Sequence, residues 1–261
     1  MKSQPTLKDL CIQPGRTLGT WVQIDAPEIV DMLGLNGFEF IVIDCEHGPF
    51  GIETAERLAR GAAATGVAVA ARVSRCDPVE IMKALDAGIP HIVVPAVASA
   101  AMAEEAVAAT RFSPRGLRGA CPCVRSAGHF VRNWPDYAAA EEARTGIFAL
   151  IETAEGSASI DAICAVEGLA GIVAGPFDLS VSMGFNGDWR RGEVRNALVR
   201  MVETCRANGL PIIMPVFAPD PAECADLVAG WTELGVTTFL IGSDKILIAN
   251  TIHNWASGLK E

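Results

Sequence analysis

The stretch IVIDCEHGPFG, residues 41–51, begins as a buried strand and ends as a polar loop. Three β-branched residues open it, and such residues are enriched in strands. Asp44, Glu46 and His47 follow directly, just before a Gly-Pro pair. A solvated turn requires only small polar residues such as Asn, Ser or Gly. Two carboxylates and an imidazole at the end of a buried strand therefore indicate a candidate functional site.

The pattern of an apolar strand followed by an amphipathic stretch recurs along the chain, and eight strands are expected in total. Their apolar runs are continuous, which is typical of a parallel sheet buried on both faces. Eight strands with a helix after each predict an α/β protein with a (β/α)8 TIM-barrel fold. The expected strands are residues 17–24, 38–44, 67–73, 91–97, 147–152, 171–176, 210–216 and 237–242, and the expected helices include residues 53–65, 78–87, 193–208 and 220–231.

The length of 261 residues suits a single TIM-barrel domain over residues 1–261. One region breaks the alternation, and residues at about 112–146 are expected to form a long loop. Five arginines and no acidic residue lie between Arg111 and Arg132, which predicts contact with an anionic substrate or with carboxylates of a neighbouring subunit. A solvated surface loop is the alternative. A C-terminal helix is expected at about 244–258.

The composition argues against several classes of partner. A net charge of −10 without a basic tail disfavours binding to nucleic acid or to an anionic membrane. The N-terminal segment lacks the apolar core of a signal peptide, and no apolar run reaches the length of a membrane span. The eight cysteines are scattered without a CxxC pair, as in proteins with reduced thiols. We therefore expect a cytoplasmic protein that acts on a small molecule.

The carboxyl ends of the strands carry the chemistry in TIM-barrel enzymes. Four expected strands bring ionisable residues to that rim, namely Asp44 with His47, Arg72, Glu152 and Asp178. Glu152 and Asp178 supply hard oxygen ligands that suit Mg²⁺ or Mn²⁺, which a 2-oxo acid can also chelate. Arg72 offers donors to an enolate oxygen, and His47 is a natural proton carrier that Asp44 can orient. Taken alone, Asp44 also suits a loop cap and Arg72 an ion pair.

Several motifs resemble those of the HpcH/HpaI aldolases, which are metal-dependent, pyruvate-specific enzymes of aromatic or sugar acid catabolism. The most specific are DCEHGP at residues 44–49 and GPFDLSVSMG at residues 175–184, and SPRGLRG at residues 113–119 also matches. The resemblance covers nearly the whole chain. It implies retro-aldol cleavage, and the reverse aldol addition, of a 4-hydroxy-2-oxo acid through a metal-stabilised pyruvate enolate. Pyruvate and an aldehyde would be the products.

The resemblance also implies a cofactor, an assembly and residue roles. The cofactor would be Mg²⁺, Mn²⁺ or Co²⁺, and the assembly a homo-oligomer, a hexamer built as a dimer of trimers with exchanged C-terminal helices. His47 matches the base of the family, and Asp44 matches its dyad partner. Arg72 matches the residue that stabilises the enolate. Asp86, in LDAG at residues 85–88, matches an acid that raises the basicity of the histidine.

The remaining implied roles concern metal and substrate. Glu152 and Asp178 match the metal ligands, and the backbone at Phe177-Asp178 matches the contact to the pyruvate carboxylate. Two departures, Leu150 for the usual Gln and Phe177 for a small residue, predict a more apolar and tighter pocket. The expected substrate-binding residues are Trp21, Leu150, Gly175, Pro176, Phe177, Asp178 and Arg125.

For specificity, we expect pyruvate-sized donors and acceptor aldehydes whose far end carries a carboxylate or hydroxyls. Arg125 is the arginine of the long loop that we expect to bind such a carboxylate. The alternative is that Arg125 pairs with an acidic residue across a subunit contact.

Three other functions are open on the sequence. A CoA-ester lyase of the same superfamily would use a similar metal site but needs room for a nucleotide. A non-catalytic barrel would act as an assembly or ligand-sensing module. A Schiff-base aldolase needs a lysine at a strand end, and Lys245 is the lysine that comes near one.

Overall fold

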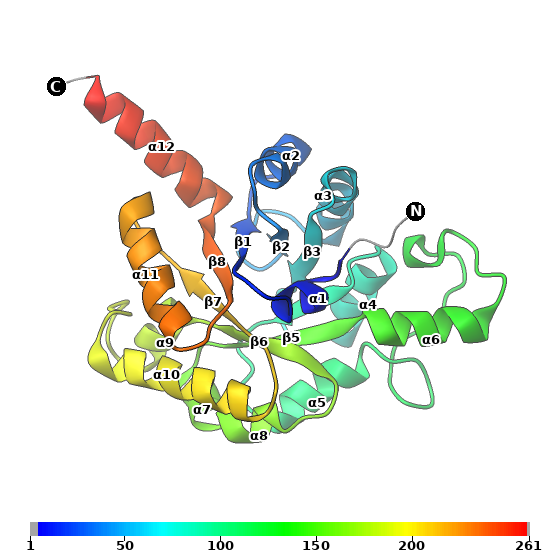
Figure 1. Ribbon diagram of the computed structural model, residues 1–261. Helices are drawn as coiled ribbons and strands as arrows, with labels where there is room; N and C mark the ends of the chain where they lie inside the picture. The colour runs from blue at the N-terminus through cyan, green and yellow to red at the C-terminus, as the bar shows by residue number, and fades with distance from the viewer. Residues whose placement is uncertain (1–4, 260–261) are drawn as a thin grey trace.

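The computed structural model describes residues 5–259 and contains a closed barrel of eight parallel strands in the order β1 to β8 (Figure 1). The predicted TIM barrel is therefore confirmed. Residues 1–4 and 260–261, which the single-domain prediction includes, lie outside the described residues. The strands are β1 Thr17–Val22, β2 Phe40–Asp44, β3 Ala68–Arg72, β4 His91–Val94, β5 Gly146–Ile151, β6 Leu169–Ala174, β7 Ile212–Val216 and β8 Thr238–Ser243.

Helices cover the outside of the barrel, and their ends follow local sequence signals. Asp77 and Asp220 each cap a helix by accepting hydrogen bonds from two backbone N–H groups, and a proline follows each cap. The helices are α1 Leu7–Cys11, α2 Pro27–Leu35, α3 Ile52–Thr65, α4 Pro78–Asp86, α5 Ala100–Ala108, α6 Trp134–Arg144, α7 Ala154–Ala158, α8 Ile160–Cys164, α9 Pro176–Ser182, α10 Gly192–Ala207, α11 Pro221–Glu233 and α12 Asp244–Gly258.

The strands bury apolar side chains on both faces. Along β2, Phe40 and Val42 belong to a cluster inside the barrel, whereas Ile41 and Ile43 belong to the cluster between the strands and the helices. Full burial of such a side chain stabilises a fold by about 1.5–3 kcal/mol. Because side chains alternate between the two faces of a strand, Asp44 occupies the next inward position, at the mouth of the barrel.

The N-terminal end of the barrel is closed by α1, whose Leu7 and Leu10 join the interior cluster. His91, the first residue of β4, is fully buried near this end, with its ring 5.5 Å from that of Phe148. Neither ring nitrogen of His91 has a hydrogen-bond partner, and burial lowers its pKa to about 3. His91 is therefore a neutral core residue at the end of the barrel opposite the rim residues.

The segment predicted as a long loop at about 112–146 is not all loop. It contains a 3-10 turn at Arg125–Ala127 and the helix α6 at Trp134–Arg144. This helix begins with a proline near its first position, and the rings of Phe112 and Trp134 pack 5.0 Å apart. The prediction missed α6 because its apolar residues pack on the loop itself, so they show no strong helical period.

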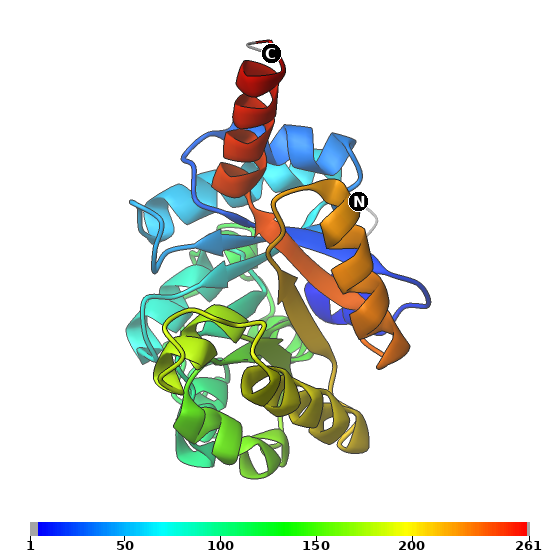
Figure 2. The same ribbon diagram turned by 90° about the vertical axis from the view of Figure 1, so that its left-hand side faces the viewer.

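The C-terminal helix α12 projects away from the barrel (Figures 1 and 2). It occupies the range expected from the sequence. Three of its apolar residues, Ile248, Ile252 and Trp255, are exposed, the last to 71%. Neither α12 nor any other helix within residues 5–259 is long and apolar enough to cross a membrane.

Candidate active site

A cavity of about 630 Å³ opens at the carboxyl ends of the strands. Its wall includes residues at or just after the carboxyl ends of β1, β2, β3, β5, β6, β7 and β8, so the barrel closure brings distant parts of the chain together. Of the residues predicted for the site, those that line this cavity are Trp21, His47, Arg72, Leu150, Glu152, Gly175, Pro176, Phe177 and Asp178. Asp44 is fully buried beside it, and Asp86 and Arg125 line a different cavity.

Asp44 and Arg72 form the buried ion pair of the site. They are register partners on β2 and β3, so their side chains leave the sheet on the same face. Arg72 donates from Nε to Oδ1 of Asp44 at 2.8 Å and from Nη2 to Oδ2 at 2.7 Å. This two-point contact fixes the plane of the guanidinium as well as its position.

Burial opposes ionisation of both partners, yet their mutual attraction prevails. Burial alone would raise the pKa of Asp44, but Arg72 and donors that include Gln23 hold that pKa below its ordinary value. In the same way, Asp44, Glu46 and Glu152 raise the pKa of Arg72 in spite of its burial. The arginine is therefore a permanent, oriented cation at the cavity wall.

Two further contacts hold the Arg72 side chain. Its guanidinium carbon lies 4.4 Å from the ring centroid of Trp21, a cation–π contact. Its Nη1 lies 3.1 Å from Oε2 of Glu46, close enough for an ion pair, although the alignment leaves that oxygen without a hydrogen bond. The two charges still attract each other, because Coulomb attraction between unit charges depends little on angle.

Glu152 and Asp178 line the same cavity from neighbouring strand ends. Glu152 is largely buried and accepts one hydrogen bond, from the backbone N–H of Ala96 at 2.8 Å. Burial raises the pKa of Glu152 to about 7, and the carboxylates of Asp178 and Glu46 add to the effect. Asp178 lies in the first turn of α9 and is exposed. The cavity thus gathers more carboxylate charge than its protein cations neutralise.

His47 lies on the rim, and its exposed side chain lines the cavity. The backbone N–H of His47, not its imidazole, donates to Oδ1 of Asp44 at 3.2 Å. Within residues 5–259, the structure has no hydrogen bond between the imidazole and either Asp44 or Asp86. The expected dyad therefore stays a prediction, whereas the contact that the structure gives Asp44 is with Arg72.

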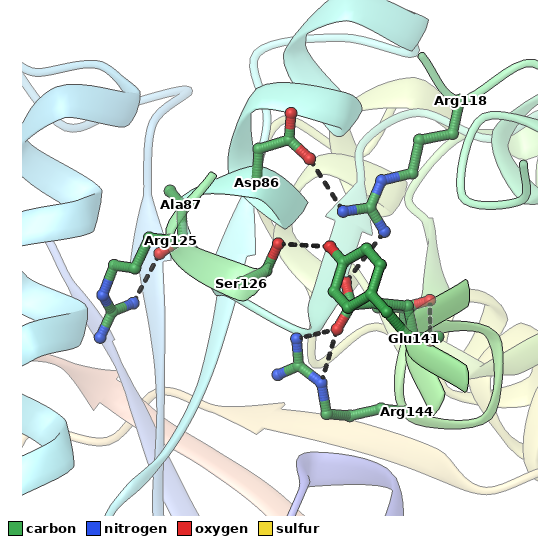
Figure 3. A network of polar contacts seen from close by, with 9 residues as sticks. Asp86, Ala87, Arg118, Arg125, Ser126, Glu141 and Arg144 are labelled. Atoms are coloured by element: carbon green, nitrogen blue, oxygen red, sulfur yellow. Dashed lines mark hydrogen bonds and ion pairs between the residues drawn. The ribbon is translucent and has the colours of Figure 1, made fainter. Parts of the chain in front are cut away.

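Asp86 and Arg125 line a cavity of about 880 Å³ between α3, α4 and the segment that precedes α6. Asp86 accepts from Arg118 at 2.9 Å, and Arg118 also donates to Glu141 at 3.1 Å (Figure 3). Arg125 donates to the backbone carbonyl of Ala87 at 2.6 Å. Neither Asp86 nor Arg125 lines the cavity at the barrel mouth, so the structure shows no contact there for the roles predicted from the sequence.

Sequence reasoning missed two residues that build the polar side of the site. Gln23 donates from Nε2 to Oδ2 of Asp44 at 2.7 Å. Asp244, at the end of β8, accepts from the backbone N–H groups of Gln23 and Ile24 at 2.9 and 2.8 Å. Asp244 thereby ties the end of β1 to the start of α12. Their positions at strand ends were the available signal.

It also missed Trp189, Phe217, Ser243 and Ile246, which line the cavity from beyond β6, β7 and β8. Trp189 and Phe217 lie in loops without a periodic pattern. Among residues 5–259, no group of three His, Cys, Asp or Glu side chains is arranged to hold a metal ion. Metal binding would therefore rest on two carboxylates, Glu152 and Asp178, completed by oxygens from outside the chain.

Comparison with known proteins places these residues in a family. The family model described as HpcH/HpaI aldolase/citrate lyase matches residues 17–243. A 5-keto-4-deoxy-D-glucarate aldolase of Klebsiella pneumoniae is 30% identical over 244 residues, which are 94% of this chain and 92% of that protein.

Solved structures agree. A HpcH/HpaI aldolase/citrate lyase family protein from Burkholderia cenocepacia has a TM-score of 0.89 at 26% identity, covering 98% of this chain and 99% of that one. The citrate synthase SbnG has a TM-score of 0.86 at 29% identity, covering 98% of both chains. A citrate lyase beta subunit from Mycobacterium tuberculosis, complexed with oxaloacetate and magnesium, shares only the fold, with a TM-score of 0.58 at 16% identity over 91% of this chain and 96% of that one.

Proposed function

Because the chain belongs to the HpcH/HpaI aldolase/citrate lyase family and is a carbon–carbon lyase, we propose that it cleaves a 4-hydroxy-2-oxo acid to pyruvate and an aldehyde. The reverse aldol addition would use the same site. The observation that carries the proposal is the convergence of Arg72, His47, Glu152 and Asp178 on one cavity at the mouth of the barrel. The full-length similarity to a sugar-acid aldolase supports it.

The residues fit a divalent cation such as Mg²⁺, Mn²⁺ or Co²⁺. Burial, and after it the carboxylates of Asp178 and Glu46, raise the pKa of Glu152 to about 7, and a cation beside Glu152 would favour its ionised form. Ions of this kind use one or two carboxylates together with water and substrate oxygens, so Glu152 and Asp178 suffice. A cation bound there would act as a Lewis acid toward the keto oxygen of the substrate.

Arg72 contributes a fixed positive charge. In cleavage the C3–C4 bond breaks, its electron pair forms the enolate of pyruvate, and negative charge grows on the former keto oxygen. A donor that is already oriented stabilises such charge without reorganising, and the pair with Asp44 provides this orientation. Trp21 covers the guanidinium and keeps water from one of its faces.

His47 moves the proton. It would take the proton of the C4 hydroxyl as the C3–C4 bond breaks and the aldehyde forms, directly or through a water molecule. Returning a proton to C3 of the enolate completes pyruvate, so protons and electrons balance. His47 suits this role because it lines the cavity and its side chain is exposed to solvent, from which it can exchange protons.

A retro-aldol screen tests the proposal. Purified protein with Mg²⁺ or Mn²⁺ is given 4-hydroxy-2-oxo acids that differ in their tails, and pyruvate release is followed through a coupled dehydrogenase. We expect release from at least one of them, and loss of release in Glu152→Gln. A citryl thioester serves as a parallel substrate, since the family model also covers citrate lyase. Turnover of that compound alone would assign the chain to the CoA-ester lyases.

Assembly is part of the proposal. The exposed apolar residues of α12 give the chain a surface that suits contact with a second copy. A groove of about 510 Å³ at the base of α12, lined by Val216, Ala225 and Leu247 among others, provides a matching apolar site. We propose a homo-oligomer that uses α12, with the hexamer of the resemblance as its form.

A further inference from the structure

The cavity at the barrel mouth has two chemically different sides. The polar groups His47, Arg72 and Glu152 come from the ends of β2, β3 and β5. Beyond β6, β7 and β8 the lining changes to large apolar side chains, which are Phe177, Trp189, Phe217 and Ile246. Because β6, β7 and β8 are neighbours in the barrel, these side chains lie on one side of the cavity, which we call the apolar wall. Asp178, which follows Phe177 in the sequence, lines the same cavity. Leu150, which also lines the cavity, is buried, whereas the ring of Phe177 is half-exposed.

Two aromatic residues of this wall, Phe177 and Trp189, are held in place by contacts outside the cavity. Gly187 has a φ of +88°, and a Cβ built on it would stand 3.0 Å from the ring of Phe177, so the ring rests closely on this turn. The guanidinium of Arg190 stacks on Trp189 at 4.3 Å from the ring centroid and pairs with Glu223 of α11. Trp189 is thus fixed between Arg190 and the cavity.

The charges around the cavity do not suit an anionic tail. The carboxylates of Glu152 and Asp178 would offset the charge of the proposed cation, and the guanidinium of Arg72 is already paired with Asp44 and lies beside Glu46. No lysine or second arginine lines this cavity among residues 5–259. The hydroxyl of Ser243, which also lines the cavity, accepts from the backbone N–H of Ile246 at 3.3 Å. Arg125, which was expected to receive a carboxylate, lies on the other cavity.

From this division we propose that the wall formed by Phe177, Trp189 and Phe217 binds the tail of the acceptor aldehyde, and that this tail is apolar and best an aromatic ring. The inference rests on the proposed aldol chemistry and names its substrate class. Pyruvate occupies the polar side, and the aldehyde carbonyl faces C3 of the enolate while its ring stacks on the apolar wall. Aromatic rings prefer such offset or edge-to-face contacts. A cavity of about 630 Å³ is large enough for both reactants.

The test compares acceptors in the aldol direction with pyruvate at a fixed concentration. Benzaldehyde represents the aromatic class, glyceraldehyde the hydroxylated class and succinic semialdehyde the acidic class. We expect kcat/KM for benzaldehyde to exceed that of each other aldehyde by about 10-fold or more, as for a well-matched apolar pocket. Phe177→Ala and Trp189→Ala should each lower kcat/KM for benzaldehyde by about 10-fold, mainly through KM, and change that for glyceraldehyde by less than about 3-fold.

Two sets of controls separate specificity from folding. Phe130→Ala removes a ring that is 62% exposed and does not line the cavity at the barrel mouth, and it should leave all three values of kcat/KM unchanged. Phe177→Leu and Trp189→Leu keep an apolar side chain at each site and should keep the preference for benzaldehyde over glyceraldehyde. If the alanine variants fail to fold, the leucine variants with Phe177→Ser and Trp189→Ser carry the comparison.

Several results would overturn the inference. The inference is wrong if the wild type prefers succinic semialdehyde or glyceraldehyde. It is also wrong if the alanine variants lose kcat/KM equally for all three aldehydes. Exchange of the C3 protons of pyruvate with solvent, followed by NMR in D2O without any aldehyde, separates the acceptor preference from the aldol function. Exchange without addition to benzaldehyde refutes the acceptor class alone, whereas absence of exchange refutes the aldol function on which it rests.

Discussion

Replacing Asp44 by Asn should disable the site through Arg72 and not through His47. Five donors point at the two carboxylate oxygens of Asp44, two from Arg72 and one each from Gln23 and the backbone of Glu46 and His47. Each oxygen accepts from at least one nitrogen of Arg72. The NH₂ group of an asparagine would therefore face donors whichever way the amide is turned.

The cost follows from the burial of this pair. Removing Asp44 leaves Arg72, with 8% of its side chain exposed, as a charge that Glu46 and Glu152 offset only in part. Breaking such a buried pair destabilises a protein by about 3–5 kcal/mol. For a chain of this size the melting temperature should fall by about 10 °C. A displaced guanidinium should also lower kcat/KM for cleavage by about 10²-fold or more, as for the loss of one oriented donor.

A double-mutant cycle tests whether Asp44 acts on the activity through Arg72 or through His47. Activity is compared for Asp44→Asn, Arg72→Ala and the double variant, and again for Asp44→Asn with His47→Ala. If Asp44 acts by holding Arg72, the double variant with Arg72→Ala is about as active as Arg72→Ala alone. Thermal unfolding is recorded at one protein concentration, since assembly would shift it.

The opposite pattern would refute this reasoning. Asp44→Asn would then keep its melting temperature, change the pH profile of activity, and show its coupling with His47 instead of Arg72. That outcome would restore the dyad expected from the sequence.

Three further predictions concern other parts of the molecule. Burial lowers the pKa of His91 from its ordinary 6.5 to about 3, so between these pH values the unfolded chain binds a proton that the folded chain does not. The contribution of His91 to the free energy of unfolding should therefore be constant above pH 6.5. It should fall as the pH drops toward 3, by about 2–3 kcal/mol at pH 4.5. Urea unfolding at pH 7 and pH 4.5 should show a smaller loss of unfolding free energy in His91→Leu than in the wild type. The same loss in both proteins would contradict the prediction. Light scattering of the wild type should show an oligomer, and the double variant Ile252→Glu/Trp255→Glu, which places charges on the apolar surface of α12, should be a monomer. A wild-type mass of 27.5 kDa would contradict assembly through α12. Arg125→Ala should have the same effect on kcat/KM for succinic semialdehyde and for a neutral aldehyde, because Arg125 does not line the cavity at the barrel mouth. A selective loss of kcat/KM for the acidic aldehyde would show that Arg125 binds its carboxylate.

The strand ends were the predictable part of the site. The alternation that places Phe40 and Val42 inside the barrel also delivers Asp44 to its mouth, and the same rule holds for Arg72 on β3. Eight apolar runs with a helix after each, in a chain of 261 residues, favour a (β/α)8 barrel, and the structure has this barrel. The chemistry of the rim then follows from which polar residues end each strand.

The partner of Asp44 could not be read from the chain. His47 is three residues away and invites a pairing, whereas Arg72 is 28 residues away and is brought alongside by the strand register. Loop residues were equally hidden. Trp189 and Phe217 line the cavity from segments without periodicity, and α6 packs within the segment that was expected to be a loop. Tertiary contacts, not local pattern, decide these positions.

The most direct test of the account is proton exchange at C3 of pyruvate, because it isolates enolate formation from the identity of the aldehyde. Wild-type protein with Mg²⁺ or Mn²⁺ in D2O should exchange these protons, and EDTA or Glu152→Gln should stop the exchange. His47→Ala should slow it by about 10²–10⁴-fold, the usual worth of a general base. Exchange at the full wild-type rate in metal-free protein, or in the Glu152→Gln and His47→Ala variants, would contradict the central claim that this cavity makes the enolate.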